Sequence, residues 1–80
     1  MDEKAIFVKE YLQPLLKAAI GNVAECSYRR VESGREIVSI RMASVSDYNA
    51  TGYNITYDID VTADSFIAIA ADVIRVMQFK

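Results

Sequence analysis

The chain of 80 residues contains no histidine and no tryptophan, and its single cysteine is Cys26. Without histidine the sequence supplies neither a Cys-His nor a Ser-His nucleophilic pair, and it lacks the side chain that most often transfers protons near neutral pH. One cysteine without histidine also cannot assemble a zinc cluster. The composition therefore predicts a protein that is not an enzyme, with no catalytic residues and no metal site.

Glycine is scarce as well. The three glycines stand alone at positions 21, 34 and 52, so no glycine-rich loop is present to cradle a phosphate group. We therefore expect no cofactor. A single cysteine allows no intramolecular disulfide, which favours a reducing compartment.

Long apolar runs are missing too. No stretch approaches the roughly 20 uncharged residues that span a bilayer, and the start MDEKAIF is acidic where a signal peptide is basic. These features predict a cytoplasmic protein that does not enter a membrane. Its hydrophobic content of 52% and charged content of 25% are typical of a globular chain, and its length predicts one domain over residues 1–80.

Residues 2–20 have the apolar periodicity of a helix, which Gly21 and Asn22 end. Pro14 removes a hydrogen bond and clashes with the preceding turn, but it lies on the solvent side, where a bend is tolerated. Two outcomes stay open: one kinked helix, or two short helices that break near Gln13. The predicted buried stripe comprises Val8, Leu12, Leu15, Leu16 and Ala19, with Ala5 and Tyr11 beside it.

Two runs of alternating residues flank the sequence Glu32-Ser33-Gly34 and predict a β-hairpin. A two-residue loop would set Arg29 opposite Val38 and mix charge into an apolar row. A three-residue loop, with Gly34 in the left-handed conformation, yields an apolar row and two pairs of opposite charge, so we prefer it. Cys26 is then a buried apolar residue and not a reactive thiol. The preferred register pairs Ala24 with Met42, Cys26 with Ile40, Tyr28 with Val38, Glu25 with Arg41, Ser27 with Ser39, and Arg30 with Glu36.

Residues 53–61 alternate strictly between apolar and polar side chains, which predicts a third strand with one buried face that begins at Tyr53. Residues 62–78 predict an amphipathic helix with Thr62 as its N-cap. The apolar side of this helix covers about 180°, more than the ~100° that a minimal core contact needs. Packing against both the sheet and the first helix explains the excess, and a bound partner is the alternative. Its apolar positions are Phe66, Ile67, Ile69, Ala70, Val73, Ile74, Val76 and Met77.

The predicted order is α-β-β-β-α, an α+β domain in which a three-stranded antiparallel meander carries both helices on one face. This topology resembles that of double-stranded RNA-binding domains, which place lysines at the start of the second helix to grip phosphates. Here residues 62–65 read TADS, the net charge is −2 and the pI is near 4.9. Because phosphate neutralisation dominates nucleic-acid affinity, direct nucleic-acid binding is disfavoured.

The run VTADSFIAIAADV, residues 61–73, has a second resemblance. It is similar to the C-terminal part of short proteins of Gram-positive bacteria and of their phages and mobile elements. Those proteins follow a tyrosine-rich last strand with a VTADS cap and an AIAxDV helix. The resemblance implies a bacterial cytoplasmic origin and a relation to phages, and it carries over no catalytic or binding residues.

The leading hypothesis is a small non-catalytic module that binds another protein or a second copy of itself as a homodimer. Charge is divided on the sheet face that the helices leave uncovered, with arginines near the hairpin and aspartates on the last strand. Such a face can pair with a partner of complementary charge, and a merely solvated face is the alternative. The candidate interaction residues are Arg29, Arg35, Arg41, Asp58 and Asp60.

Two further hypotheses concern nucleic acids. The chain could inhibit a host nucleic-acid-binding protein as a decoy, with aspartates in place of phosphates. The less favoured one is direct nucleic-acid binding through the arginines of the hairpin. The aspartates that the decoy hypothesis uses are Asp47, Asp58, Asp60 and Asp64.

Overall fold

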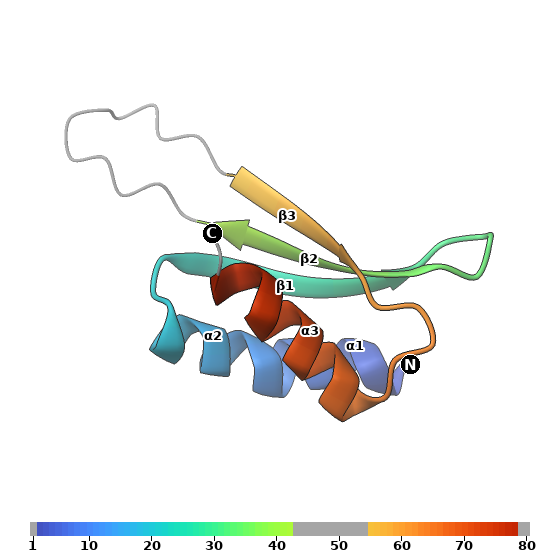
Figure 1. Ribbon diagram of the computed structural model, residues 1–80, viewed down its shortest axis with the longest axis horizontal. Helices are drawn as coiled ribbons and strands as arrows, with labels where there is room; N and C mark the ends of the chain where they lie inside the picture. The colour runs from blue at the N-terminus through green and yellow to red at the C-terminus, as the bar shows by residue number, and fades with distance from the viewer. Residues whose placement is uncertain (1, 43–54, 79–80) are drawn as a thin grey trace.

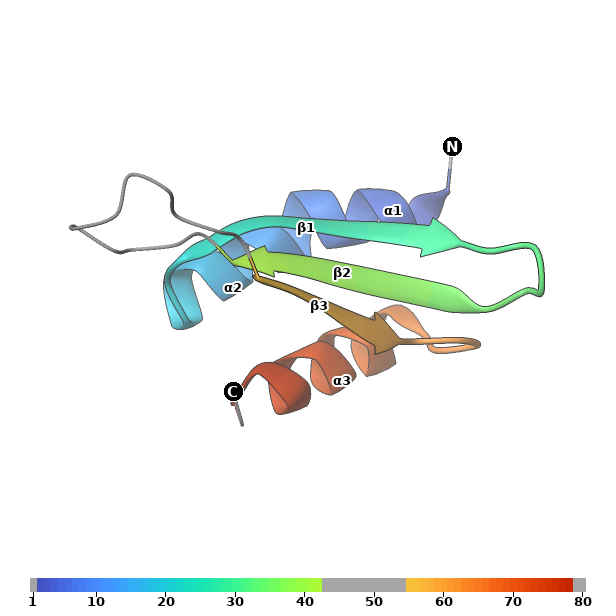
Figure 2. The same ribbon diagram turned by 90° about the horizontal axis from the view of Figure 1, so that it is seen from above.

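The computed structural model describes residues 2–42 and 55–78, which form a helical layer on one face of a three-stranded sheet (Figure 1). The strands are antiparallel and follow the order β1-β2-β3, a meander. Seen from above, the first helical segments lie along β1 and the last helix lies along β3 (Figure 2). The predicted α-β-β-β-α fold with both helices on one face is confirmed. The elements are α1 (Glu3–Phe7), the π-helix η1 (Val8–Leu12), α2 (Gln13–Ala19), β1 (Val23–Arg30), β2 (Glu36–Met42), β3 (Ile55–Asp60) and α3 (Phe66–Gln78).

The first helix continues through Pro14 because the chain winds as a π-helix just before the proline. The Gln13 amide donates to the carbonyl of Val8, five residues back. Pro14, which has no N–H to donate, then falls in the opening turn of α2, directly after this π-type hydrogen bond. The alternative of two helices that break near Gln13 is therefore wrong, and the π turn is how the helix accommodates the proline.

The buried stripe of this helix is narrower than predicted. Val8, Leu12 and Leu16 are fully buried, whereas Leu15 is 49% exposed and Ala19 is exposed as well. The helix lies along the β1 side of the sheet, so one line of side chains spaced four residues apart reaches the core. Leu15 sits about 100° away from Leu16 around the helix axis and faces away from that line.

The hairpin has the predicted three-residue loop. The Val31 amide donates to Arg35 O at 2.9 Å, the Gly34 amide donates to Val31 O at 2.9 Å, and Gly34 has φ of +91°. The predicted pairs hold along β1 and β2 with one exception. A bulge between Val23 and Glu25 brings Val23, and not Ala24, opposite Met42. The larger valine side chain thereby fills the end of the core.

The start of α3 was predicted too early. The helix begins at Phe66, and Ser65 caps it because its hydroxyl accepts a hydrogen bond from the Ala68 amide at 3.2 Å. Ala63 has φ of +63°, a left-handed conformation that no helix can include, so Thr62 cannot be the N-cap. Thr62 instead forms hydrogen bonds with β2 and β3.

The apolar side of α3 is only partly buried. Ile69, Val73 and Met77 face the core, but Ile67 is 82% exposed and Phe66 is 40% exposed. Packing within the fold therefore does not use the full width of this apolar side. Tyr53, the predicted first residue of the third strand, lies outside the described residues.

One hydrophobic core joins the two layers. Its buried members come from η1, α2, α3, all three strands and the position just after β3: Val8, Leu12, Leu16, Val23, Cys26, Val38, Ile40, Ile59, Val61, Ile69, Val73 and Met77. Among the described residues, none of the helices combines the length and apolar character needed to cross a bilayer.

The Cys26 thiol is buried in this core, and burial raises its pKa to about 11. Since the thiolate is the reactive form, we expect Ellman's reagent to label the folded protein at pH 7.5 at least about 100-fold more slowly than the chain unfolded in urea. Equal labelling rates in the two states would contradict the predicted burial of Cys26.

Candidate functional site

The five predicted interaction residues lie on the uncovered sheet face or at its hairpin end, and the structure pairs them with neighbours. Arg29 Nη1 donates to Ser39 Oγ at 2.6 Å, and Ser39 Oγ donates to Asp58 Oδ1 at 2.7 Å. The Arg29 guanidinium also lies 3.8 Å from the Asp58 carboxylate. Arg35 donates to Asp60 Oδ2 through Nε at 3.1 Å and through Nη2 at 3.0 Å.

Arg41, the fifth predicted residue, completes this set of pairs. Its Nη2 lies 3.4 Å from Glu25 Oε1, and Lys9 approaches the other Glu25 oxygen at 3.8 Å. Each predicted arginine thus has an acidic partner on the same face. Charges that are matched across strands stabilise the sheet by small amounts and leave little uncompensated charge for a partner.

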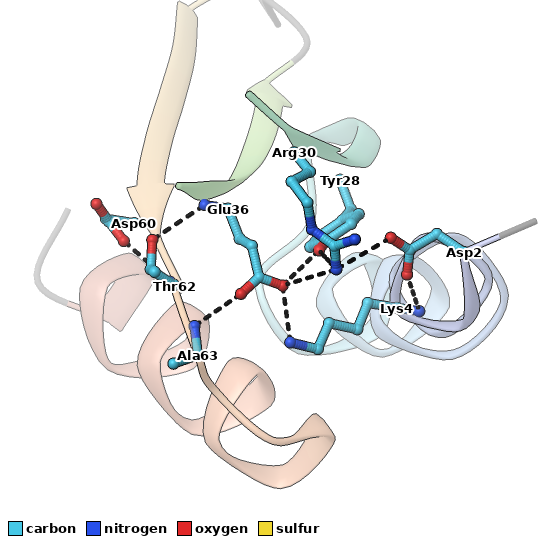
Figure 3. Close-up of polar contacts among 8 residues, drawn as sticks. All are labelled: Asp2, Lys4, Tyr28, Arg30, Glu36, Asp60, Thr62 and Ala63. Atoms are coloured by element: carbon cyan, nitrogen blue, oxygen red, sulfur yellow. Dashed lines mark hydrogen bonds and ion pairs between the residues drawn. The ribbon is translucent and has the colours of Figure 1, made fainter. Parts of the chain in front are cut away.

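Glu36 is a polar residue that sequence analysis noticed only as the partner of Arg30, and it is just 5% exposed. Figure 3 shows three donors that converge on its carboxylate from different parts of the fold. Lys4 Nζ lies 2.7 Å from Oε1, the Tyr28 hydroxyl donates to Oε1 at 2.5 Å, and the Ala63 amide donates to Oε2 at 2.7 Å. We call Glu36 and these donors the Glu36 cluster.

The backbone beside Glu36 is held in the same region. The Glu36 amide donates to Thr62 Oγ1 at 3.0 Å, and the Thr62 amide donates to Asp60 Oδ1 at 2.9 Å (Figure 3). The Arg30 guanidinium lies 3.5 Å from Glu36 Oε1 and 3.4 Å from Asp2, the residue that caps α1. The Glu36 cluster therefore ties α1, the hairpin and the connection between β3 and α3 together.

The electrostatics of this cluster fix its protonation state. Hydrogen bonds from Lys4, Tyr28 and the Ala63 amide lower the pKa of Glu36 to about 2, and burial together with the bond to Glu36 raises the pKa of Tyr28 to about 12. Near neutral pH the glutamate stays ionised and the tyrosine stays protonated. Neither group is poised for general acid–base catalysis, which needs a pKa near the working pH.

A second acidic contact lies at the start of α3. Hydrogen bonding to Asp72 and burial raise the pKa of Asp64, and Asp72 accepts a hydrogen bond from Arg75 at 2.9 Å. Within residues 2–42 and 55–78, no three potential metal-ligating side chains come together. Asp64, which the decoy hypothesis uses as a phosphate substitute, is half-buried.

An aromatic hollow lies on the outer surface of the helical layer, between α1, η1 and the start of α3. It has a volume of about 290 Å³, and its lining consists of Glu3, Ile6, Phe7, Tyr11 and Phe66. Phe7 stacks on Phe66 with 5.0 Å between ring centroids and 5° between planes, and Tyr11 lies 6.1 Å from Phe7. Tyr11 is 68% exposed and Phe66 is 40% exposed, whereas Phe7 is half-buried. We call this feature the aromatic groove.

A smaller hollow of about 200 Å³ adjoins the aromatic groove across Ile6. Its lining consists of Ala5, Ile6, Lys9 and Glu10. Glu3 and Glu10 therefore line the two hollows, and neither forms an ion pair with a residue that the structure describes. This surface was not predicted from the sequence, because the helical periodicity places Tyr11 beside the buried stripe. The one available signal was the excess apolar width of the last helix.

No protein family, curated protein or solved structure matches this chain. The resemblance of residues 61–73 to short proteins of Gram-positive bacteria and phages stays a prediction. Function must therefore be argued from the surfaces of the fold.

Proposed function

We propose that the protein is a small non-catalytic interaction module that binds a protein partner through the aromatic groove. The observation that carries the proposal is a hollow lined by three aromatic rings, of which Phe7 and Phe66 are stacked and Tyr11 and Phe66 are exposed to water. Single exposed apolar residues are ordinary, but a contiguous patch of them marks a binding surface. A hollow of about 290 Å³ is large enough to take one or two apolar side chains of a partner.

The uncovered sheet face is less suited to binding a partner than the aromatic groove, because its charges are already paired. Arg29 and Asp58 bind each other through Ser39, and Arg35 binds Asp60. A partner that docked there would have to break or desolvate these pairs, which offsets much of the attraction. We therefore assign the five charged residues to cross-strand pairing and place the binding surface on the helical layer.

The Glu36 cluster supports a role without catalysis. Its buried Glu36 and half-buried Tyr28 have pKa values of about 2 and about 12, far from neutral pH. Catalytic acids and bases are tuned toward the working pH, whereas structural ion pairs are driven away from it. We assign the cluster to holding the helices and the hairpin together.

The hypotheses that involve nucleic acids gain no supporting observation from the described residues. Asp58 and Asp60 pair with arginines, and Asp64 is half-buried beside Asp72. Asp47 lies outside the described residues. The hairpin arginines that would contact phosphates are paired in the same way.

We further propose a cytoplasmic location and a bacterial or phage origin. The buried, unpaired thiol of Cys26 supports a reducing compartment. The similarity of residues 61–73 to short proteins of Gram-positive bacteria and phages supports the origin.

Site-specific photocrosslinking tests the proposed binding surface. Benzoylphenylalanine at Tyr11 is expected to give discrete protein adducts in a bacterial lysate, because this side chain projects from the aromatic groove. The same amino acid at Ser27, an exposed position on the uncovered sheet face, is the matched control and is expected to give none. Discrete adducts from Ser27 alone, or from neither position, would refute the proposal.

A further inference from the structure

We infer that the aromatic groove binds a cationic amphipathic helix of another protein. This inference rests on the proposed function and adds the chemistry of the partner. Two properties of the groove carry it: the shape of its apolar floor, and the charge that its surroundings leave uncompensated.

The apolar floor has room for two neighbouring side chains. The hollows of about 290 Å³ and about 200 Å³ share Ile6 as a common wall, so they lie side by side on one helical surface. On a partner helix, side chains three or four positions apart lie about 5–6 Å from each other on one face. A helix can therefore seat one apolar side chain in each hollow, as in other complexes in which a helix lies in a groove.

The charge around these hollows is negative and unmatched. Glu3 lines the larger hollow and Glu10 lines the smaller one, and neither has an ion-pair partner among the described residues. Lys4 pairs with Glu36 at 2.7 Å, and Lys9, which lines the smaller hollow, has Glu25 as its ion-pair partner at 3.8 Å. A partner with lysine or arginine beside its apolar residues would form ion pairs with both glutamates.

A second copy of this chain fits the groove less well. Among the basic residues that the structure describes, Lys17 alone makes no ion pair. A symmetric dimer must satisfy Glu3 and Glu10 of both copies from its own surface. Within residues 2–42 and 55–78, one unpaired lysine in each copy supplies less positive charge than the two acids need.

The test uses two synthetic helical peptides of 14 residues with the same leucine face and one tryptophan. The first carries lysine on its polar face and the second carries glutamate. Because this chain has no tryptophan, the fluorescence of the peptide reports binding without background. We expect the lysine peptide to bind at least about tenfold more tightly in 50 mM salt, with the difference shrinking at 0.5 M salt.

Variants locate the binding to the groove. Replacing both acids, Glu3→Gln with Glu10→Gln, is expected to weaken binding of the lysine peptide about tenfold. Glu32→Gln is the matched control, since Glu32 is an exposed hairpin acid that also has no ion pair with a residue the structure describes, and it should leave the affinity unchanged. Tyr11→Ser removes an exposed ring and should weaken binding of the lysine peptide as well.

The outcomes separate this inference from the proposed function. Equal affinity for the two peptides, binding to neither, or equal effects of Glu32→Gln and the double variant would overturn the cationic partner. A particle of twice 9.0 kDa in sedimentation that Tyr11→Ser dissociates would overturn it too, but would retain the groove as the binding surface. Absence of adducts from the crosslinker at Tyr11 would contradict the proposed function itself.

Discussion

Glu36→Gln is expected to lower the melting temperature by more than about 10 °C, although glutamine has nearly the same shape as glutamate. The substitution removes the charge that Lys4 and the Ala63 amide are arranged to meet, and it leaves the Lys4 ammonium half-buried without its counterion. Thermal unfolding followed by circular dichroism measures the effect. Glu25→Gln is the control, because Glu25 forms its ion pairs at the surface, and it should shift the melting temperature by less than about 3 °C.

The pH dependence of this difference follows from the pKa of Glu36. Its pKa is lowered to about 2 from an ordinary value of 4.5, so the folded state favours the ionised form. The contribution of Glu36 is therefore fully present above pH 4.5 and is lost as the pH falls toward 2. The gap in melting temperature between the wild type and Glu36→Gln should close over this range. A gap that stays constant from pH 6 to pH 2 would contradict the role assigned to the carboxylate.

Leu16→Ala is expected to destabilise the protein by about 2–5 kcal/mol, whereas Leu15→Ala should change its stability by less than about 0.5 kcal/mol. The two leucines are neighbours in the sequence, but Leu16 is fully buried and Leu15 is 49% exposed. The alanine at position 16 leaves a cavity in the core, and the alanine at position 15 leaves none. Urea unfolding at 25 °C measures both free energies.

Similar losses at the two positions would contradict the observed orientation of the first helix. They would instead support the broader stripe that the sequence predicted. Both substitutions replace leucine with alanine in the same turn of α2, so a difference in stability between them reports the difference in burial.

The hairpin register was predictable because its determinants are local. The loop residue Gly34 and the charged pairs of the hairpin all distinguish one register from the next. A shift by one residue would separate Glu25 from Arg41 and Arg30 from Glu36. The bulge that replaces Ala24 with Val23 opposite Met42 was not predictable. It brings Val23 into a core whose other members lie far away in the sequence, which no local pattern reports.

The first helix shows why helical periodicity has limits. An ideal wheel cannot represent the π turn that precedes Pro14, and it cannot tell which edge of an apolar stripe faces another element. Leu15 and Tyr11 were therefore assigned to or near the core, although both are exposed. Because Tyr11 is exposed and not in the core, its ring lines the aromatic groove.

The start of α3 and the Glu36 cluster were missed for a shared reason. Thr62 and Ser65 are both good capping residues, and local sequence does not decide between them. Glu36 decides between them, because its backbone amide donates a hydrogen bond to the Thr62 hydroxyl and its carboxylate accepts one from the amide of Ala63, which has a left-handed conformation. Such contacts join residues that are 26 and 27 positions apart, so they become apparent only when the chain is folded.

The most direct test of the binding surface is an NMR titration of the isotopically labelled protein with the lysine peptide, which maps every perturbed amide. We predict that the largest shifts fall in residues 3–11 and at Phe66, which contribute the lining of the two hollows. Largest shifts at Ser27, Ser39 and Asp58, on the uncovered sheet face, would contradict the assignment of binding to the helical layer.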